Sequence, residues 1–239
     1  MKRTLVYVGP TLSLAEVARL LPSALVQPPA AVGDLLRLVL GPARERPARI
    51  AIIDGYFERM AAVWHKEILR AIEVGIEVWG ASSMGALRAA ELAPFGMRGV
   101  GAIYKAFERG TLTCDDEVAV AHLPQEYGYK ATSVALVDLR EGIAKAPMLT
   151  KVDRERLVEL ARKRFYRDRS WEQLGEDARG TIAAAKLTKL AAWTKPSRKA
   201  DDARLLLRTL AKSPATKPPK LRVPRTWAIK QLEAWLDDQ

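Results

Sequence analysis

Two apolar strands, each followed after a short connection by a helix, constrain the fold of this chain most. Residues 49–54 (Arg-Ile-Ala-Ile-Ile-Asp) predict a fully buried strand, and residues 76–79 (Ile-Glu-Val-Trp) predict a second one. Runs of helix-forming residues follow at 63–73 and 86–92. Strands that alternate with helices in this way are typical of parallel sheets. We therefore expect an α/β fold with a mainly parallel sheet flanked by helices.

The alternation continues less clearly on either side of this segment. Further strands are expected at residues 5–8, 24–27 and 133–139, and a short helix at 103–109. The glycine-rich stretch at 95–101 has no clear periodicity. Hydrophobic periodicity leaves the order of the strands in the sheet open.

The composition changes along the chain and suggests four segments. We expect an α/β core over residues 1–148, a helical extension over 149–212, a basic proline-rich linker over 213–225 and an amphipathic C-terminal helix over 226–239. The net charge of +11 is concentrated late in the chain, because residues 195–225 hold 10 basic and 2 acidic side chains. That basic stretch lacks any recognised nucleic-acid motif, so we do not expect a nucleic-acid partner.

Several classes of protein are excluded by what the chain lacks. No apolar run reaches the roughly 18 residues of a membrane-spanning helix, and the N-terminus does not have the pattern of a signal peptide. The single cysteine, Cys114, cannot form an internal disulfide. Neither a nucleotide-binding motif nor a Cys/His cluster is present. We expect a cytoplasmic protein without a bound metal, cofactor or membrane.

A serine turn between the strand at 76–79 and the helix after it carries the clearest chemistry. Small residues must surround a nucleophilic serine on such a turn, because the backbone folds tightly there. Ser83 has Ala81 before it and Gly85 after it, whereas Ser82 is followed at the same spacing by Met84. Ser83 is therefore the better candidate nucleophile, with Ser82 as an assisting residue. The alternative is that one of the two serines merely caps the helix.

Lys66 and His65 are the candidate bases for this serine. In a parallel sheet, each helix that follows a strand begins at the carboxyl edge of the sheet, so Lys66 and Ser83 are expected on the same edge. A lysine beside a serine can act as its general base. Adjacent helical residues point about 100° apart, so both candidates cannot easily face the serine. His65 ranks second because the sequence shows no acidic residue to orient it.

The end of the strand at 49–54 supplies the remaining candidate groups. Asp54 could orient the lysine or cap the next turn. Gly55 allows the backbone to approach closely, so its N–H or that of Tyr56 is expected to join the Met84 N–H in an oxyanion hole. The acidic run at 115–117 could bind a metal, but such a loop is more often simply solvated.

Long strings of residues resemble the TfuA-like protein family. These strings are Asp54-Gly55-Tyr56-Phe57, Val63-Trp64-His65-Lys66-Glu67-Ile68-Leu69 and Gly80-Ala81-Ser82-Ser83-Met84-Gly85-Ala86-Leu87-Arg88-Ala89-Ala90-Glu91-Leu92. The resemblance covers roughly residues 49–140 and leaves the last hundred uncovered.

The resemblance implies a role in peptide backbone thioamidation beside a YcaO enzyme. A TfuA-like protein is thought to release sulfide from a thiocarboxylated carrier of the ThiS type and to help YcaO engage its precursor peptide. The family's Ser-Lys pair corresponds to Ser83 and Lys66 by motif. Hydrolysis through an acyl-serine needs no cofactor. The alternative is a non-catalytic adaptor that binds YcaO and its peptide through the tryptophans of the last helix.

Overall fold

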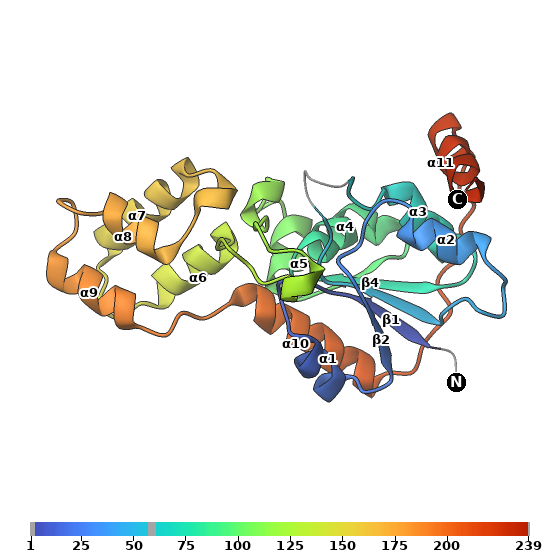
Figure 1. Cartoon of the computed structure of the whole chain (residues 1–239), viewed down its shortest axis with the longest axis horizontal. Helices are drawn as coiled ribbons and strands as arrows, with labels where there is room; N and C mark the ends of the chain where they lie inside the picture. Colours follow the sequence, from blue (N-terminus) through green and yellow to red (C-terminus); the bar gives the residue numbers. More distant parts are fainter. Residues whose placement is uncertain (1–2, 57–60, 239) are drawn as a thin grey trace. The chain divides into compact units, whose positions relative to one another are not determined.

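The computed structural model describes residues 3–56 and 61–238, and it shows an α/β protein (Figure 1). Its five-stranded sheet is entirely parallel and has the order β2-β1-β3-β4-β5. The strands are β1 Thr4–Tyr7, β2 Ala24–Gln27, β3 Arg49–Ile52, β4 Glu77–Ala81 and β5 Arg98–Val100. The predicted α/β class is confirmed. Strand β5 lies inside the glycine-rich stretch in which no strand was predicted.

The order of the strands identifies one edge of the sheet as the expected place for a functional site. The chain forms β1, moves outward to β2, and then returns to the other side of β1 as β3. Because all strands are parallel, their carboxyl ends meet at a single edge of the sheet. Ligands of such sheets bind outside this edge, close to the point where the strand order reverses. Here that point lies between β1 and β3.

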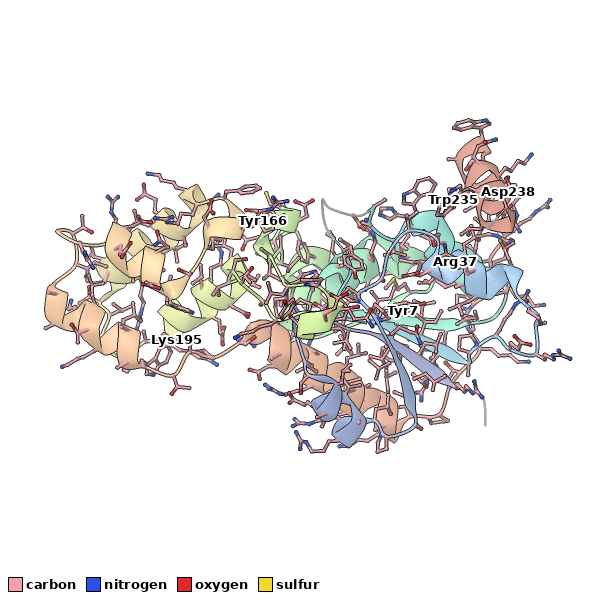
Figure 2. The ribbon with its side chains drawn as sticks, in the orientation of Figure 1. Tyr7, Arg37, Tyr166, Lys195, Trp235 and Asp238 are labelled. Atoms are coloured by element: carbon pink, nitrogen blue, oxygen red, sulfur yellow. The ribbon has the colours of Figure 1, made fainter. Side chains whose placement is uncertain are left out.

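One face of the sheet is covered by α2, α3 and α4, and α11 packs against α2 in this layer (Figure 1). Their bounds are Asp34–Leu40, His65–Glu73, Met84–Leu92 and Trp227–Asp237. Helix α11 is part of this core, because Ile229 and Leu232 are buried in it. Figure 2 shows Trp235 of α11 near Arg37 of α2, with the guanidinium 5.9 Å from the centre of the indole ring. The last helix therefore packs on the protein's own core.

The other face of the sheet is covered by α1 and α10, which span Leu14–Leu20 and Arg198–Lys212. Leu206 and Leu207 of α10 are completely buried against Val6 and Ala51 of the sheet, within one hydrophobic cluster. A remaining short helix, α5 (Ala102–Glu108), follows β5. Ser13 accepts a hydrogen bond from the Glu16 N–H and so caps the start of α1.

The basic segment 213–225 joins α10 to α11 without regular secondary structure. The Thr216 hydroxyl donates to Glu77 Oε1 over 2.6 Å, and the Val223 N–H donates to Glu73 Oε1 over 2.8 Å. Val223 is also buried. The linker expected over 213–225 is therefore held against the core by two acidic side chains.

The chain divides into two compact units, one of residues 1–113 with 200–239 and one of residues 114–199. The sequence had suggested boundaries after residues 148 and 212 instead. Helix α10 accounts for much of this difference, because its apolar side lies in the core of the first unit rather than in a helical extension. Hydrophobic periodicity predicts that a helix has a buried face, but it does not identify the surface that buries it.

The second unit is helical and has its own hydrophobic core. Its helices are α6 Leu136–Lys145, α7 Lys151–Lys163, α8 Trp171–Asp177 and α9 Ala184–Ala192. The strand predicted at 133–139 is wrong, because α6 begins at Leu136. The buried residues Leu136, Leu139 and Ile143 are spaced by three and four, which is the helical period. None of the helices in the described residues is both long and apolar enough to span a membrane.

Candidate active site

The segments that follow β1, β3 and β4 meet at the carboxyl edge of the sheet in the first unit. Gly9 follows β1, the Asp54-Gly55-Tyr56 segment follows β3, and Ser82 follows β4. The predicted candidates from the β3 and β4 connections are thus on one edge, as expected for a parallel sheet. What each of these residues can do depends on its hydrogen bonds.

Ser82 occupies a strained turn between β4 and α4. Its φ is +69°, and the Ser83 N–H donates to the Ala81 carbonyl over 2.9 Å across it. A hydrogen bond between residues i and i+2 around a residue of positive φ defines the rare and strained type of γ-turn. A non-glycine residue is held this way only where its surroundings enforce the conformation, and such strain is frequent at functional sites.

Glycines allow the helix after this turn to pack directly on the sheet. A Cβ on Gly80 would lie 1.9 Å from the Gly85 carbonyl oxygen, and a Cβ on Gly85 would lie 1.7 Å from the Ile52 carbonyl oxygen. Both distances are far below any van der Waals contact, so only glycine fits at either position. The N-terminus of α4 is consequently fixed against β3 and β4.

Neither serine hydroxyl caps α4. Ser83 is the N-cap residue, but its side chain makes no capping hydrogen bond. The Ser82 hydroxyl is fully buried and has no hydrogen-bond partner in the part of the chain that the structure describes. The simple capping interpretation of these serines therefore fails. Ser83 keeps 8% of its surface exposed, whereas Ser82 keeps none.

Two backbone N–H groups beside the serines are unused. The Met84 N–H and the Gly55 N–H donate to no acceptor among the described residues. The Tyr56 N–H, by contrast, donates to the Ala30 carbonyl over 3.0 Å, so it is not available as an oxyanion donor. Gly55 approaches α4 so closely that a Cβ there would lie 2.8 Å from Met84 Cγ. The two free donors thus come from neighbouring backbone segments.

The hydrogen bonds also discriminate between the two serines. In a nucleophile elbow, the N–H of the residue after the nucleophile is one of the oxyanion donors. The residue after Ser82 is Ser83, whose N–H is already bonded to the Ala81 carbonyl. The residue after Ser83 is Met84, whose N–H is unused. The unused Met84 N–H therefore favours Ser83 as the nucleophile. The residue with the strained backbone is Ser82, just before it, whereas in a hydrolase elbow the nucleophilic serine itself is strained.

Asp54 serves the loop that follows β1. Its Oδ2 accepts the N–H groups of Gly9 and Thr11 over 2.9 and 3.1 Å, and its Oδ1 accepts the Thr11 hydroxyl over 2.6 Å. The carboxylate is buried and fills the crevice between β1 and β3 where doubly wound sheets bind ligands. Its described hydrogen bonds go to this loop, and none of them goes to Lys66.

Lys66 lies in the first turn of α3, half-buried, and makes no hydrogen bond or ion pair with any residue that the structure describes. The buried side of this helix is marked by Ile68, Ala71 and Ile72. At about 100° per residue, Lys66 lies nearly opposite to that side. The structure therefore leaves the ammonium group unpaired and does not show it at Ser83.

His65 has the acidic partner that sequence reasoning missed. Its Nε2 lies 2.7 Å from Glu91 Oε2, and Arg88 Nη1 lies 2.7 Å from the same oxygen. Glu91 and Arg88 belong to α4, three residues apart on one helix face. Both residues belong to the string at 80–92, but no rule of sequence spacing predicts that Glu91 pairs with His65. Only the packing of α3 against α4 shows the pair.

Glu67, the next residue of α3, is structural. Its carboxylate is fully buried and accepts the N–H groups of Gly33, Trp64 and Leu36 over 2.7, 3.1 and 3.4 Å. Burial raises the pKa of Glu67, and these hydrogen bonds oppose the rise. Burial also raises the pKa of Tyr7 well above its usual range. The hydrogen bonds of Glu67 therefore connect α3 to the start of α2.

Two carboxylates of the acidic run at 115–117 are paired with arginines. The Glu117 carboxylate receives two hydrogen bonds from Arg140, and Asp116 pairs with the buried Arg169. No group of three or more potential metal ligands occurs in the described residues. The arrangement at the edge of the sheet thus offers a serine, unused backbone donors and an unpaired lysine.

Comparison with known protein families agrees with the resemblance seen in the sequence. The family model of TfuA-like proteins matches residues 54–170. Residues 54–170 of this chain belong to the TfuA-like family. The match begins at Asp54 and includes Lys66 and the serine turn, and it continues past residue 140, where the resemblance was expected to end. No curated protein matches the chain.

The family assignment gives the protein an accessory role in a YcaO-associated system. The TfuA-like region contains strand β4 and the serine turn in the first unit and helices α6 and α7 in the second. The serine turn therefore lies inside the matched region, while α10 and α11 lie outside it.

Proposed function

We propose that this TfuA-like protein is a serine hydrolase that releases sulfide from a thiocarboxylated ThiS-type carrier for a YcaO enzyme. The observation that carries the proposal is the pair of unused N–H groups of Met84 and Gly55 beside Ser83. Donors held in place before the reaction stabilise the oxyanion of an acyl-transfer intermediate, and removal of one such donor typically costs about 100- to 1,000-fold in rate.

The chemistry balances without a cofactor. The Ser83 oxygen attacks the carbonyl carbon of the thiocarboxyl group while a base takes the hydroxyl proton. The carbon–sulfur bond then breaks, and the sulfur leaves as sulfide with a proton. Water hydrolyses the acyl-serine, which returns the carrier as a carboxylate and restores the serine.

Lys66 is the proposed base, and His65 is the competing one. Lys66 has an unpaired ammonium group on a flexible side chain of four methylenes, which can turn toward a bound carrier tail. His65 is held by Glu91 through Nε2, which leaves its Nδ1 for proton transfer. Lys66→Met and His65→Gln distinguish the two, because only loss of the true base should abolish sulfide release.

The decisive experiment measures sulfide release from a thiocarboxylated ThiS-type carrier by wild-type protein, Ser83→Ala and Ser82→Ala. We expect Ser83→Ala to abolish release and Ser82→Ala to retain it. Ser13→Ala, which removes the N-cap of α1, is the matched control and should retain full activity. Equal release by Ser83→Ala and wild type would exclude Ser83. No release by wild type, with YcaO present, would reject the hydrolase proposal.

The adaptor alternative draws support from α11. Trp227 is 76% exposed, although the same helix buries Ile229 in the core. Tryptophan is enriched among residues that dominate interface affinity. Deletion of residues 213–239 would remove buried core residues, so Trp227→Ala is the sharper test of YcaO binding. A tenfold loss of affinity, about 1.4 kcal/mol, with unchanged stability would support an adaptor surface there.

A further inference from the structure

A groove in the second unit has no role in the proposed chemistry. It is lined by residues of α6 and α7 and has a volume of about 680 Å³. Its apolar lining includes Ile143 and Ala144 from α6 and Val158 from α7. Residues three or four apart on each helix line it, which is the pattern of a groove that receives another helix. The occupant is indicated by the charges along its rim.

Most of the charged residues at this groove are already paired. Arg140 is held by two hydrogen bonds to Glu117, at 2.8 and 3.0 Å. Lys163 donates to Glu159 over 2.7 Å. These positive charges are neutralised within the second unit, so neither of them indicates that an anion binds from outside.

Two arginines of the groove are not neutralised. Arg154 donates from Nη2 to the Ala146 carbonyl over 3.1 Å, but it has no carboxylate partner in the described residues, and its Nε is buried without an acceptor. Arg162 makes no ion pair with any described residue. A buried donor without a partner is unfavourable, and an acceptor on a ligand would relieve this cost. Both guanidinium groups therefore favour carboxylates at the groove.

The spacing of the two arginines favours a helical partner. Arg154 and Arg162 lie eight residues apart in α7, which is about 12 Å along a helix axis. Acidic residues about two turns apart on a second helix match this distance, while an apolar residue between them would meet Val158. We propose that the α6–α7 groove binds an acidic amphipathic helix of a protein partner.

A nucleic acid fits the same groove poorly. Glu155 and Glu159 also line it, and a phosphate backbone carries a charge at every nucleotide, so it cannot avoid them. A peptide can place its carboxylates opposite the two arginines alone. The mixed charge and the apolar lining therefore favour a peptide over an RNA or DNA strand.

The test uses the full chain and a designed peptide probe. The probe is a fluorescein-labelled helix of roughly 15 residues, with leucines on one face and glutamates beside them. A second probe carries lysines in place of the glutamates. Fluorescence anisotropy should show binding of the acidic probe to wild type and a loss of about tenfold or more in affinity for Arg154→Glu and for Arg162→Glu.

Arg156→Glu is the matched control, because Arg156 lies on the same helix, pairs with Glu159 and does not line the groove. It should bind the acidic probe within about twofold of wild type. Circular dichroism confirms that each variant is folded, and Val158→Glu tests the apolar lining separately. Absence of binding by wild type, equal binding of the lysine probe, or unchanged affinity in both arginine variants would overturn the proposal. Displacement of the probe by a single-stranded RNA at equal concentration would overturn it in favour of a nucleic-acid site.

Discussion

Gly55 and Met84 lie against each other at the carboxyl edge of the sheet, and a Cβ on Gly55 would stand 2.8 Å from Met84 Cγ and 3.1 Å from the Ala30 carbonyl oxygen. The backbone after β3 thereby comes close to the start of α4. Their two N–H groups have no acceptor in the described chain. These two N–H groups are the ones that we propose as oxyanion donors for Ser83.

Gly55→Ala should destabilise the protein by about 1–3 kcal/mol, because the added methyl overpacks the contact with Met84. Met84→Ala removes the Cγ at 2.8 Å and leaves the Cβ at 3.0 Å, so it relieves part of the overlap, and the double variant should be more stable than the sum of the two single losses predicts. Urea unfolding of all four proteins gives the coupling, which we expect to exceed about 0.5 kcal/mol. Additive losses would contradict the contact.

Gly80→Ala and Gly85→Ala should each cost more than about 4 kcal/mol or prevent folding, because each methyl would collide with backbone oxygen that cannot move alone. Gly175→Ala in α8 is the control, since a Cβ there meets nothing within 4 Å. That variant should be neutral or more stable by up to about 1 kcal/mol. Thermal unfolding followed by circular dichroism measures all three; equal effects at the three sites would reject this packing.

Ser82→Gly should stabilise the protein by about 1 kcal/mol. Glycine relieves the positive φ and removes a buried hydroxyl that has no partner, and these gains exceed the entropy that glycine adds to the unfolded chain. Ser82→Ala removes the hydroxyl but keeps the strain, so its gain should be smaller. Denaturant unfolding measures both variants, and a loss of stability in Ser82→Gly would show that the hydroxyl has a partner.

Arg169→Met should destabilise the second unit by about 3 kcal/mol or more. The guanidinium is almost fully buried, donates to the carbonyls of Ala161 and Asp116, and pairs with the Asp116 carboxylate. Its removal leaves these acceptors without donors. Arg179→Met, at an exposed position, is the control and should change stability by less than about 0.5 kcal/mol. Equal unfolding midpoints in urea would refute this role.

The carboxyl of Asp153 should stabilise α7 in a pH-dependent way. Hydrogen bonds from Lys186 and Thr150 lower the pKa of Asp153 to about 2. A carboxyl with a lowered pKa stabilises the folded state above its usual pKa, and this stability is lost as the pH falls toward the folded value. The difference in unfolding free energy between wild type and Asp153→Asn should therefore be constant at pH 5–7 and shrink between about pH 4 and 2. A constant difference at pH 2.5 would contradict the lowered pKa.

The sequence by itself determined the elements whose signals are local. The runs at β1, β3 and β4 were visible because both faces of these strands are covered, which selects continuous apolar residues. The serine turn was visible because its glycines permit contacts that no other residue allows. The caps of α1, α7 and α8 at Ser13, Thr150 and Ser170 are local signals too, because capping needs a particular side chain at one position.

Only the tertiary structure decided what depends on residues distant in sequence. The apolar residues of α6 were read as a strand, because a window of seven residues does not separate the two periods reliably. The partner of His65, the use of the Tyr56 N–H and the contact of α11 with α2 each involve segments that are far apart along the chain. Periodicity shows that a residue is buried or polar, but hydrogen bonds and packing partners are set by how the chain is brought together, which no local pattern encodes.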